Sequence, residues 1–407
     1  MAPVEQLLVR AKTIVTNASN VAQHRVTFDD LGALRDGALL IRDGKIAFAG
    51  TRAETEKQIT GEVRELDFDG VIVPGFVDAH AHPLFAGNRE PDFAARLRGE
   101  KPQLGMLFTV EQTRRALDHP DHFWQHVRPR FETIAAHGTT TLEVKTGYAL
   151  HRPGETELLR LIDTHKDEAG LPRLVATFLG AHALPPEFTN EVDYVDYLID
   201  QCLPVAKADG AIYADAFCEP GFFSPAQTRR YLEAARSHGL RLRVHCDEMA
   251  FGHAAEMAAG VGVDAVDHCN YIRDADVDAI VREGIVTVAC PATIAYLGLP
   301  HPAPVRTLLE RGGNVALASD YNPGTSPCFN LQTVAYFGRA IFNLTAAEAL
   351  YAVTLAAARS LRIDAGALRV GTNADFVVLG IESPEEFGWQ FGGNLARAVF
   401  RSGRLVA

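Results

Sequence analysis

Histidine and acidic side chains occur where apolar, β-rich runs end. His80 and His82 are two apart in VDAHAH, so on a strand both point to one face. The pair alone is weak evidence, because histidines are often solvent-facing or satisfied by backbone groups. His245 ends the run LRLRVH, His268 ends VDAVDH and Asp320 ends NVALASD. Three neutral imidazoles and one carboxylate suit a divalent ion such as Zn²⁺ or Fe²⁺ and leave a position for water.

Glu248, three residues after His245 in HCDE, is the candidate for moving protons. A divalent metal lowers the pKa of its bound water toward neutrality, and a nearby carboxylate can shuttle the proton. The alternative is that Glu248 is a solvated loop residue. The pattern therefore favours hydrolysis by metal-activated water.

Three further positions are candidates for contacting a substrate. Arg89 could grip a carboxylate through two parallel hydrogen bonds, or it could be a surface arginine. The stretch NPGTSP after Asp320 could turn backbone N–H groups toward an anion, or it could be an ordinary turn. His182 in GAHALPP could equally pack at a strand end, and Tyr148 in TGYAL could be a lid residue that never touches substrate.

Eight β-rich runs carry these residues and alternate with helical patterns such as PAQTRRYLEAARSHG and HAAEMAAGVG. The runs are VIVPGFVDAHAH, TTTLEVKTGYAL, LVATFLGAHAL, IYADAFCEPG, LRLRVHCDE, VDAVDHCNYI, IVTVACPAT and NVALASDYNPG. Strands separated by helices predict parallel βαβ units with right-handed crossovers, and eight such strands close a barrel. We therefore predict an α/β chain with a (β/α)8 TIM-like barrel and a site at the C-terminal ends of its strands.

Both ends of the chain show short strand-turn-strand patterns. They are QLLVRAKTIVTN, GALLIRDGKIAFAG with an RDGK hairpin turn, EVRELDFDG, GTNADFVVLG and ARAVFRSGRLVA. We predict that the two ends meet in one small β-sandwich. The predicted composite domain spans 1–70 and 366–407, and the barrel with the metal site spans 71–365.

Three charged residues are predicted on inward-facing strand positions. Strand parity places Glu143, Lys145 and Arg243 inside the barrel, where unpaired charge is costly. We expect them to neutralise one another beneath the metal. The alternative, a carboxylated Lys145 that bridges two metals, is disfavoured because the chain already supplies a one-metal ligand set.

Composition narrows the partners and the compartment. The net charge of -12 and the lack of a Lys/Arg-dense stretch argue against nucleic acid and anionic membranes. The first residues, MAPVEQLLVRAKTIVTN, do not have the pattern of a signal peptide, and no apolar run has the length of a membrane span. The six cysteines are scattered without a CxxC pair, so we expect reduced thiols and a cytoplasmic location.

The order of these motifs resembles that found in the mononuclear branch of the amidohydrolase superfamily: HxH, then H-x-x-E, then H, then D at the last strand. Members of this superfamily are metal-dependent hydrolases. Within it the chain is similar to the imidazolonepropionases, which hydrolyse 4-imidazolone-5-propanoate to N-formimidoyl-L-glutamate in histidine degradation. The matching stretches extend from the first barrel strand to the last. They are PGFVDAHAHPLFAGNRE, LEVKTGYAL, FLGAHALPPEF, DAFCEPGFFS and ASDYNPGTSP.

The resemblance implies a role for each matching residue. The implied ligands of one Zn²⁺ or iron ion (Fe²⁺ or Fe³⁺) are His80, His82, His245 and Asp320. Glu248 and His182 would handle protons and polarise the ring carbonyl, with His268 beside the attacking water. The implied substrate contacts are Arg89, Tyr148, His182, Glu248, Asn322, Gly324 and Thr325. The resemblance also implies a small anionic imidazolone as substrate and a homodimer.

The match weakens between Arg96 and Arg114, where the chain reads RLRGEKPQLGMLFTVEQTR. The family usually carries a tyrosine and a glycine-rich turn in this region, and neither is present. We expect this segment to lie over the pocket, so the exact substrate stays open. The alternative is another mononuclear amidohydrolase, a deaminase or cyclic-amide hydrolase acting on a related anionic heterocycle. A non-catalytic binding barrel is a remote alternative, because such a protein would be free to lose ligand residues.

Overall fold

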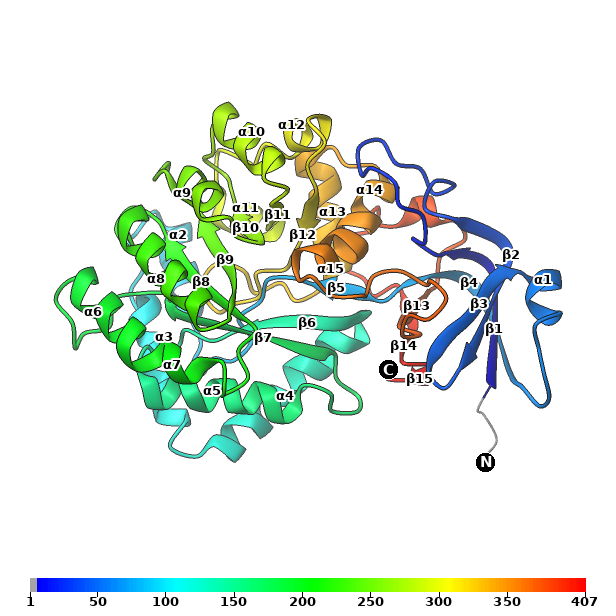
Figure 1. The fold of residues 1–407 in the computed structure, drawn as a ribbon, viewed down its shortest axis with the longest axis horizontal. Coiled ribbons are helices and arrows are strands. Elements are labelled where there is room, and N and C mark those ends of the chain that lie inside the picture. Colours follow the sequence, from blue (N-terminus) through cyan, green and yellow to red (C-terminus); the bar gives the residue numbers. More distant parts are fainter. Residues whose placement is uncertain (1–5) are drawn as a thin grey trace.

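The computed structural model describes residues 6–407 and places the chain in two parts, a barrel and a smaller sheet (Figure 1). Residues 1–5, which begin the segment predicted not to be a signal peptide, lie outside the described residues. None of the helices in residues 6–407 combines the length and apolar character needed to cross a lipid bilayer.

The smaller sheet contains strands from both ends of the chain, in the order β15-β14-β13-β4-β1-β2-β3. Its strands are β1 (Gln6–Val15), β2 (Ala33–Arg42), β3 (Lys45–Thr51), β4 (Arg64–Pro74), β13 (Phe376–Leu379), β14 (Ala396–Arg401) and β15 (Arg404–Leu405). The ends join where β4 pairs with β13, with Val73 opposite Val377. At the predicted RDGK turn, Asp43 and Gly44 both have positive φ, which suits a tight two-residue hairpin.

Alternating apolar residues give the smaller sheet its own core. Leu7 and Val9 of β1 face the same cluster as Phe376 of β13 and Phe400 of β14. The two phenylalanine rings stack with their centroids 4.4 Å apart. The predicted meeting of the chain ends is confirmed, and one continuous sheet supplies all the strands around this core.

The larger sheet has the order β5-β6-β7-β8-β9-β10-β11-β12, and every ladder in it is parallel. Its strands are β5 (Phe76–Asp78), β6 (Thr139–Lys145), β7 (Arg173–Ala181), β8 (Tyr213–Cys218), β9 (Arg241–Cys246), β10 (Ala265–His268), β11 (Val286–Ala289) and β12 (Val315–Leu317). The first and last strands meet through the residues that follow them. Asp320 N donates to His80 O at 2.9 Å, and His82 N donates to Tyr321 O at 2.9 Å. All eight predicted strands are present, which confirms the (β/α)8 barrel.

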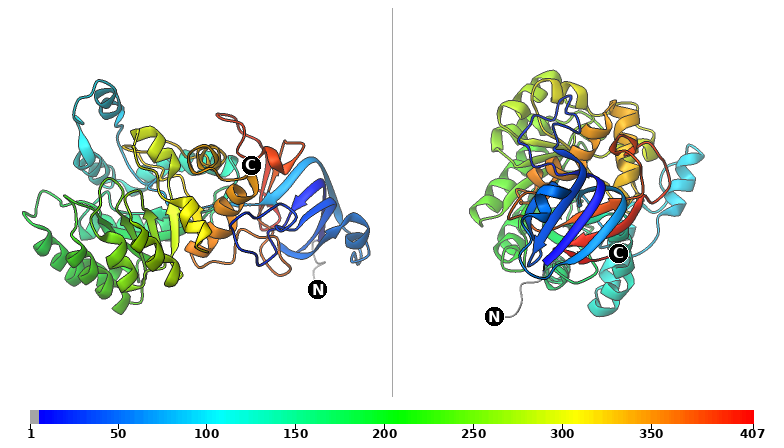
Figure 2. Two further views of the ribbon diagram at one scale, coloured as in Figure 1. Left: turned by 90° about the horizontal axis from the view of Figure 1, so that it is seen from above. Right: turned by 90° about the vertical axis from the view of Figure 1, so that its right-hand side faces the viewer.

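Helices surround the barrel sheet and cover its outer face, except α1, which lies beside β2 and β3 of the smaller sheet (Figures 1 and 2). The α-helices are α1 (Arg52–Glu56), α2 (Glu90–Leu97), α3 (Gly105–Ala116), α4 (Pro120–Ala136), α5 (Arg152–His165), α6 (Glu191–Tyr197), α7 (Leu203–Ala206), α8 (Pro225–Ser237), α9 (Ala254–Val261), α10 (Asp274–Arg282), α11 (Pro291–Leu297), α12 (Val305–Glu310), α13 (Leu331–Phe342), α14 (Ala346–Tyr351) and α15 (Ala357–Ser360). Two π-helical segments, η1 (Leu198–Cys202) and η2 (Ala352–Ala356), and one 3₁₀-helix, η3 (Pro384–Glu386), complete the set.

The helix α8 shows how the sequence specifies these elements. Ser224 precedes it and accepts a hydrogen bond from Gln227 N, and Pro225 occupies its first position. Thr228, Leu232 and Ala235 recur at helical spacing and are buried. The predicted segments PAQTRRYLEAARSHG and HAAEMAAGVG contain α8 and α9, so both helix predictions are confirmed.

Candidate functional site

The four predicted metal ligands converge at the C-terminal ends of the barrel strands. His80 and His82 follow β5, His245 lies in β9 and Asp320 follows β12. The Nε2 atoms of His80 and His82 are 3.2 Å apart, and Asp320 Oδ1 lies 3.4 and 3.5 Å from them. One donor nitrogen from each of His80, His82 and His245 lies within 4.8 Å of the others. The expected convergence is therefore present in the structure.

The electrostatics of this cluster suit metal ligands. Burial, with a contribution from the Lys145 ammonium, lowers the pKa of His80 well below its ordinary value. Burial and the neighbouring His80 do the same to the pKa of His82. Both imidazoles are therefore neutral, and a neutral imidazole keeps a lone pair for a cation.

Two carboxylates orient the histidine rings from behind. Asp267 Oδ2 lies 2.8 Å from His80 Nδ1, and Asp215 Oδ2 lies 3.0 Å from His245 Nδ1. The hydrogen bond to Asp267 holds the proton on His80 Nδ1 and leaves its Nε2 for a metal, while Asp215 accepts from the His245 backbone N–H at 3.2 Å. The sequence analysis missed both aspartates. The signal for them was an acidic residue inside an otherwise apolar strand, in IYADAF and VDAVDH.

The predicted charge network is present inside the barrel and is completed by the same two aspartates. Lys145 Nζ lies 2.9 Å from Glu143 Oε1, 2.7 Å from Asp215 Oδ2 and 3.3 Å from Asp267 Oδ2. Arg243 contacts Glu143 at 3.3 Å and Asp267 at 2.8 Å, and all five side chains are fully buried. The expectation that Glu143, Lys145 and Arg243 neutralise one another is confirmed. Burial opposes the charge on Lys145, but the three carboxylates raise its pKa, which disfavours the neutral amine that carboxylation needs.

Glu248 and His268 lie together at the rim of the cluster. Glu248 Oε2 is 3.8 Å from His268 Nε2, and both residues are buried. Burial, then the nearby Asp320 and Glu219 carboxylates, raises the pKa of Glu248 well above its ordinary value. Burial lowers the pKa of His268 to about 3. Burial thus favours the protonated form of Glu248, beside an imidazole that stays neutral.

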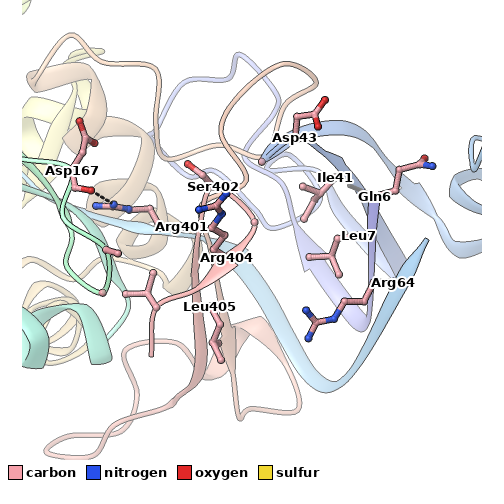
Figure 3. A pocket seen from close by; sticks show the side chains of 15 residues that line it. Gln6, Leu7, Ile41, Asp43, Arg64, Asp167, Arg401, Ser402, Arg404 and Leu405 are labelled. Carbon is pink, nitrogen blue, oxygen red and sulfur yellow. Dashed lines mark hydrogen bonds between the residues drawn. The ribbon is translucent and has the colours of Figure 1, made fainter. Parts of the chain in front are cut away.

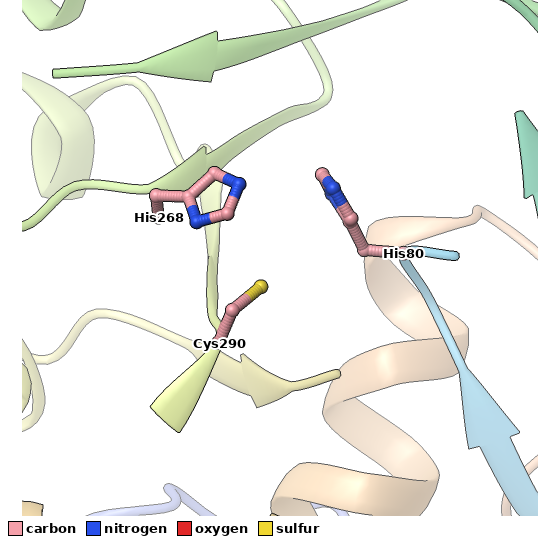
Figure 4. A group of neighbouring side chains, drawn as sticks. All are labelled: His80, His268 and Cys290. Atoms are coloured by element: carbon pink, nitrogen blue, oxygen red, sulfur yellow. The ribbon is translucent and has the colours of Figure 1, made fainter. Parts of the chain in front are cut away.

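Cys290 is a further side chain at this site that the sequence analysis treated only as a reduced thiol. It follows β11, and its sulfur forms a potential metal-binding group with His80 and His268 (Figure 4). Its position at the end of a barrel strand was the available signal. The carboxylates Asp215 and Asp267 also group with His245, but Lys145 already supplies the cation there.

A pocket of about 280 Å³ opens over the cluster and contains most of the predicted substrate contacts. It is lined by His82, Arg89, Pro102, Met106, Tyr148, His182, Phe217, Phe222, His245, Glu248, Met249, His268, Asp320, Asn322 and Thr325. His182 Nδ1 contacts Gly147 O at 3.0 Å, and burial lowers the pKa of His182 to about 3. The segment between Arg96 and Arg114 contributes Pro102 and Met106, so it lies over the pocket as predicted.

The turn after Asp320 takes the second of its two alternatives, an ordinary turn. The backbone N–H groups of Gly324 and Thr325 both donate to Asn322 Oδ1 at 2.8 Å. These N–H groups are therefore taken by a side chain and do not turn toward an anion. Thr325 still lines the pocket, whereas Gly324 lies against Arg89, where an added Cβ would come within 2.2 Å of Nη1.

A larger pocket of about 570 Å³ lies elsewhere, where the β14–β15 hairpin meets β1 and the loop before β7 (Figure 3). Its Arg401 donates to the backbone oxygens of Asp167 and Leu171 at 2.7 and 2.9 Å. No potential metal-binding group found within residues 6–407 involves this pocket's lining residues. The pocket over the histidines is therefore the better candidate for chemistry.

Comparison with known proteins gives consistent matches. Residues 71–406 match the amidohydrolase family. A Parabacteroides distasonis protein named imidazolonepropionase is 35% identical over 414 residues, which cover 98% of each chain. Proteins of the same name from Cupriavidus taiwanensis and Solibacter usitatus are 36% and 37% identical, covering 93% of this chain and 93% and 92% of theirs.

Solved structures agree on the fold. Guanine deaminase from E. coli superposes with a TM-score of 0.73 at 19% identity, covering 98% of this chain and 99% of that one. An adenosine deaminase from Xanthomonas campestris, solved with bound zinc, gives 0.72 at 19% identity and covers 99% and 93%. At this identity the likeness concerns the fold alone.

Proposed function

We propose a specific reaction on one premise: the chain belongs to the amidohydrolase family and, within it, to the imidazolonepropionases. It is a hydrolase of carbon-nitrogen bonds in cyclic amides. The proposed reaction opens the ring of 4-imidazolone-5-propanoate and yields N-formimidoyl-L-glutamate. The supporting observation is that one pocket holds both the histidine cluster and the Arg89 guanidinium, so a ring and its carboxylate side chain have separate partners.

We propose that His80, His82, His245 and Asp320 hold one divalent cation, zinc or iron. The family is metal-dependent, His80 and His82 are neutral and buried, and a carboxylate lies behind each of His80 and His245, which suits such an ion. A bound cation would supply a Lewis acid that lowers the pKa of water and polarises a carbonyl oxygen. The proposed domain division keeps all four ligands within 71–365, the barrel, and the composite domain at 1–70 and 366–407. Strand β4, which pairs with β13 in the smaller sheet, crosses the first of these boundaries and ends at Pro74.

The chain's own residues account for the proton transfers. Glu248 and His268 would hold the water, and Glu248 would accept its proton as the oxygen adds to the ring carbonyl carbon. His182 lines the pocket, and its Nδ1–H donates to Gly147 O, so its Nε2 lone pair would accept a hydrogen bond or a proton from the substrate ring. Glu248 would then return the proton to the departing ring nitrogen as the C–N bond breaks. This step matters because an unprotonated amide nitrogen leaves poorly.

Arg89 would bind the propionate. Its Nε donates to Asp92 Oδ2 at 2.8 Å, which leaves the Nη groups for a substrate carboxylate. Tyr148, Asn322 and Thr325 line the same pocket and would surround the ring and the side chain. Burial raises the pKa of Tyr148, so its phenol stays protonated as a hydrogen-bond donor.

We also propose a homodimer and a cytoplasmic location. An exposed aromatic patch of Trp389 and Phe391, with Phe391 against Tyr336 and Phe337, is consistent with the proposed homodimer. All six cysteines are free thiols, which is consistent with a reducing cytoplasm. Sedimentation equilibrium of the full chain measures the first point directly, with a dimer mass expected.

The reaction is tested by incubating the metal-loaded chain with 4-imidazolone-5-propanoate. We expect the ring's ultraviolet absorbance to decay and mass spectrometry to find N-formimidoyl-L-glutamate. Failure of this acid together with ammonia release from a related heterocycle would support the alternative, a deaminase of the same branch.

Replacing Arg89 with methionine is expected to raise KM about 10- to 100-fold with kcat little changed, because hydrogen bonds between charged partners contribute ~1.5–3 kcal/mol. Arg282→Met is the control, since Arg282 is exposed and bonds only to Glu283 among residues 6–407. Steady-state kinetics on both variants measure the effect. An unchanged KM in Arg89→Met would remove Arg89 from substrate binding.

A further inference from the structure

One buried carboxylate links Arg89 to the segment over the pocket. We propose that Asp92 is a positioning residue that sets, at the same time, the orientation of Arg89 and the position of residues 98–106, which we call the cover segment. Acid recognition and pocket covering would then be coupled through one side chain. This proposal rests on the proposed function of Arg89 as the carboxylate-binding residue.

Both oxygens of Asp92 are fully used. Oδ2 accepts from Arg89 Nε at 2.8 Å and from Gly105 N at 3.0 Å. Oδ1 accepts from the backbone N–H groups of Gln103 and Leu104 at 2.8 and 2.7 Å. Asp92 is 4% exposed; burial opposes its charge, but the backbone N–H groups together with Arg89 lower its pKa, so it is a carboxylate.

The cover segment reaches the pocket through its side chains. Pro102 and Met106 both line the pocket. They lie on either side of the three residues whose N–H groups donate hydrogen bonds to Asp92. In Figure 2 the α2–α3 region extends away from the body of the barrel. Apart from bonds to the carbonyls of Ala95 and Arg96 in α2, the backbone N–H groups of the cover segment that bond outside it donate to Asp92, which is therefore its main polar attachment near the pocket.

Arg89 is fixed on its other side by Gly324. A Cβ at Gly324 would come within 2.2 Å of Arg89 Nη1 and 2.7 Å of Cζ. The guanidinium can occupy this space only because residue 324 lacks a side chain. Since the obstructing atoms are the end of a flexible side chain, Gly324→Ala displaces Arg89 without breaking the fold. It also leaves in place the hydrogen bonds that the cover segment donates to Asp92.

Two variants therefore separate the two tasks. Asp92→Asn removes the charge that holds both Arg89 and the cover segment. Gly324→Ala disturbs Arg89 alone.

Matched controls are Asp276→Asn and Gly393→Ala. Asp276 is buried and pairs with Arg273 three residues before it, as Asp92 pairs with Arg89, but in α10. A Cβ at Gly393 meets no atom within 4 Å.

Two measurements test the coupling. The first is the ratio of kcat/KM for 4-imidazolone-5-propanoate to that for its neutral propanamide. The second is the rate of trypsin cleavage after the exposed Arg98, within the cover segment. We expect Asp92→Asn to lower the ratio about 10- to 100-fold, mainly through KM of the acid, and to speed cleavage. Gly324→Ala should lower the ratio by a similar factor and leave the cleavage rate unchanged.

The controls should match wild type in both measurements. If Asp92→Asn changes neither the ratio nor the cleavage rate beyond Asp276→Asn, the proposal is overturned. It is also overturned if kcat for acid and amide fall equally, because that result indicates only a structural defect. If wild type turns over neither compound, the proposed function fails, and calorimetric binding of 3-(imidazol-4-yl)propanoate to the same variants replaces the kinetic ratio.

Discussion

Glu248→Gln is expected to lower kcat by about 10²- to 10⁴-fold, because glutamine can neither accept the proton of water nor return it to the ring nitrogen. Metal content should stay at the wild-type level, since Glu248 lies outside the four proposed ligands. Stopped-flow or steady-state assays with the acid substrate give kcat, and atomic absorption gives the metal.

The control for this variant is Glu256→Gln, an exposed glutamate on α9. It should show wild-type turnover. Near-native turnover in Glu248→Gln would remove Glu248 from the proton transfers. A parallel loss of metal would instead assign Glu248 as a ligand, a possibility the structure raises because Glu248, His268 and Asp320 also form a potential metal-binding group.

Lys145→Met is expected to give the largest loss of stability, about 3–5 kcal/mol, because it leaves Glu143, Asp215 and Asp267 inside the barrel without their shared cation. The measurement is urea unfolding of the metal-free proteins, so that ligand binding does not contribute. Lys166→Met is the control, since Lys166 pairs with Asp163 on the surface and is half exposed.

The control should unfold near the wild-type midpoint because exposed ion pairs contribute little. A Lys145→Met variant with wild-type stability would mean that the carboxylates share protons in place of the lysine charge. A large change in the denaturant slope would instead point to an altered unfolded or native state.

The barrel and the ligand positions could be predicted because local signals specify them. Eight apolar runs separated by helical patterns leave few topologies, and the C-terminal ends of parallel strands meet at one edge of the sheet. His245, His268 and Asp320 stand at or just after these strand ends, so each could be placed from its own run. Strand parity likewise placed Glu143, Lys145 and Arg243 inside the barrel.

The remaining features depend on contacts between segments far apart in sequence. The roles of Asp215 and Asp267 depend on the strand register, which places them beside His245 and His80. The sequence does not indicate which group accepts hydrogen bonds from the backbone N–H groups after Asp320. In the structure the acceptor is the Asn322 side chain. Asp92 resembles any acidic residue in a first helical turn until the chain returns at Gln103 to Gly105.

Anomalous diffraction from crystals of the metal-loaded protein, measured at the edge of the bound metal, tests the central proposal most directly. We predict one peak, about 2.0–2.2 Å from a nitrogen of each of His80, His82 and His245 and from an Asp320 oxygen. A sole peak at His268 and Cys290, or at Asp215 and Asp267, without contact to His82 and Asp320, would contradict it.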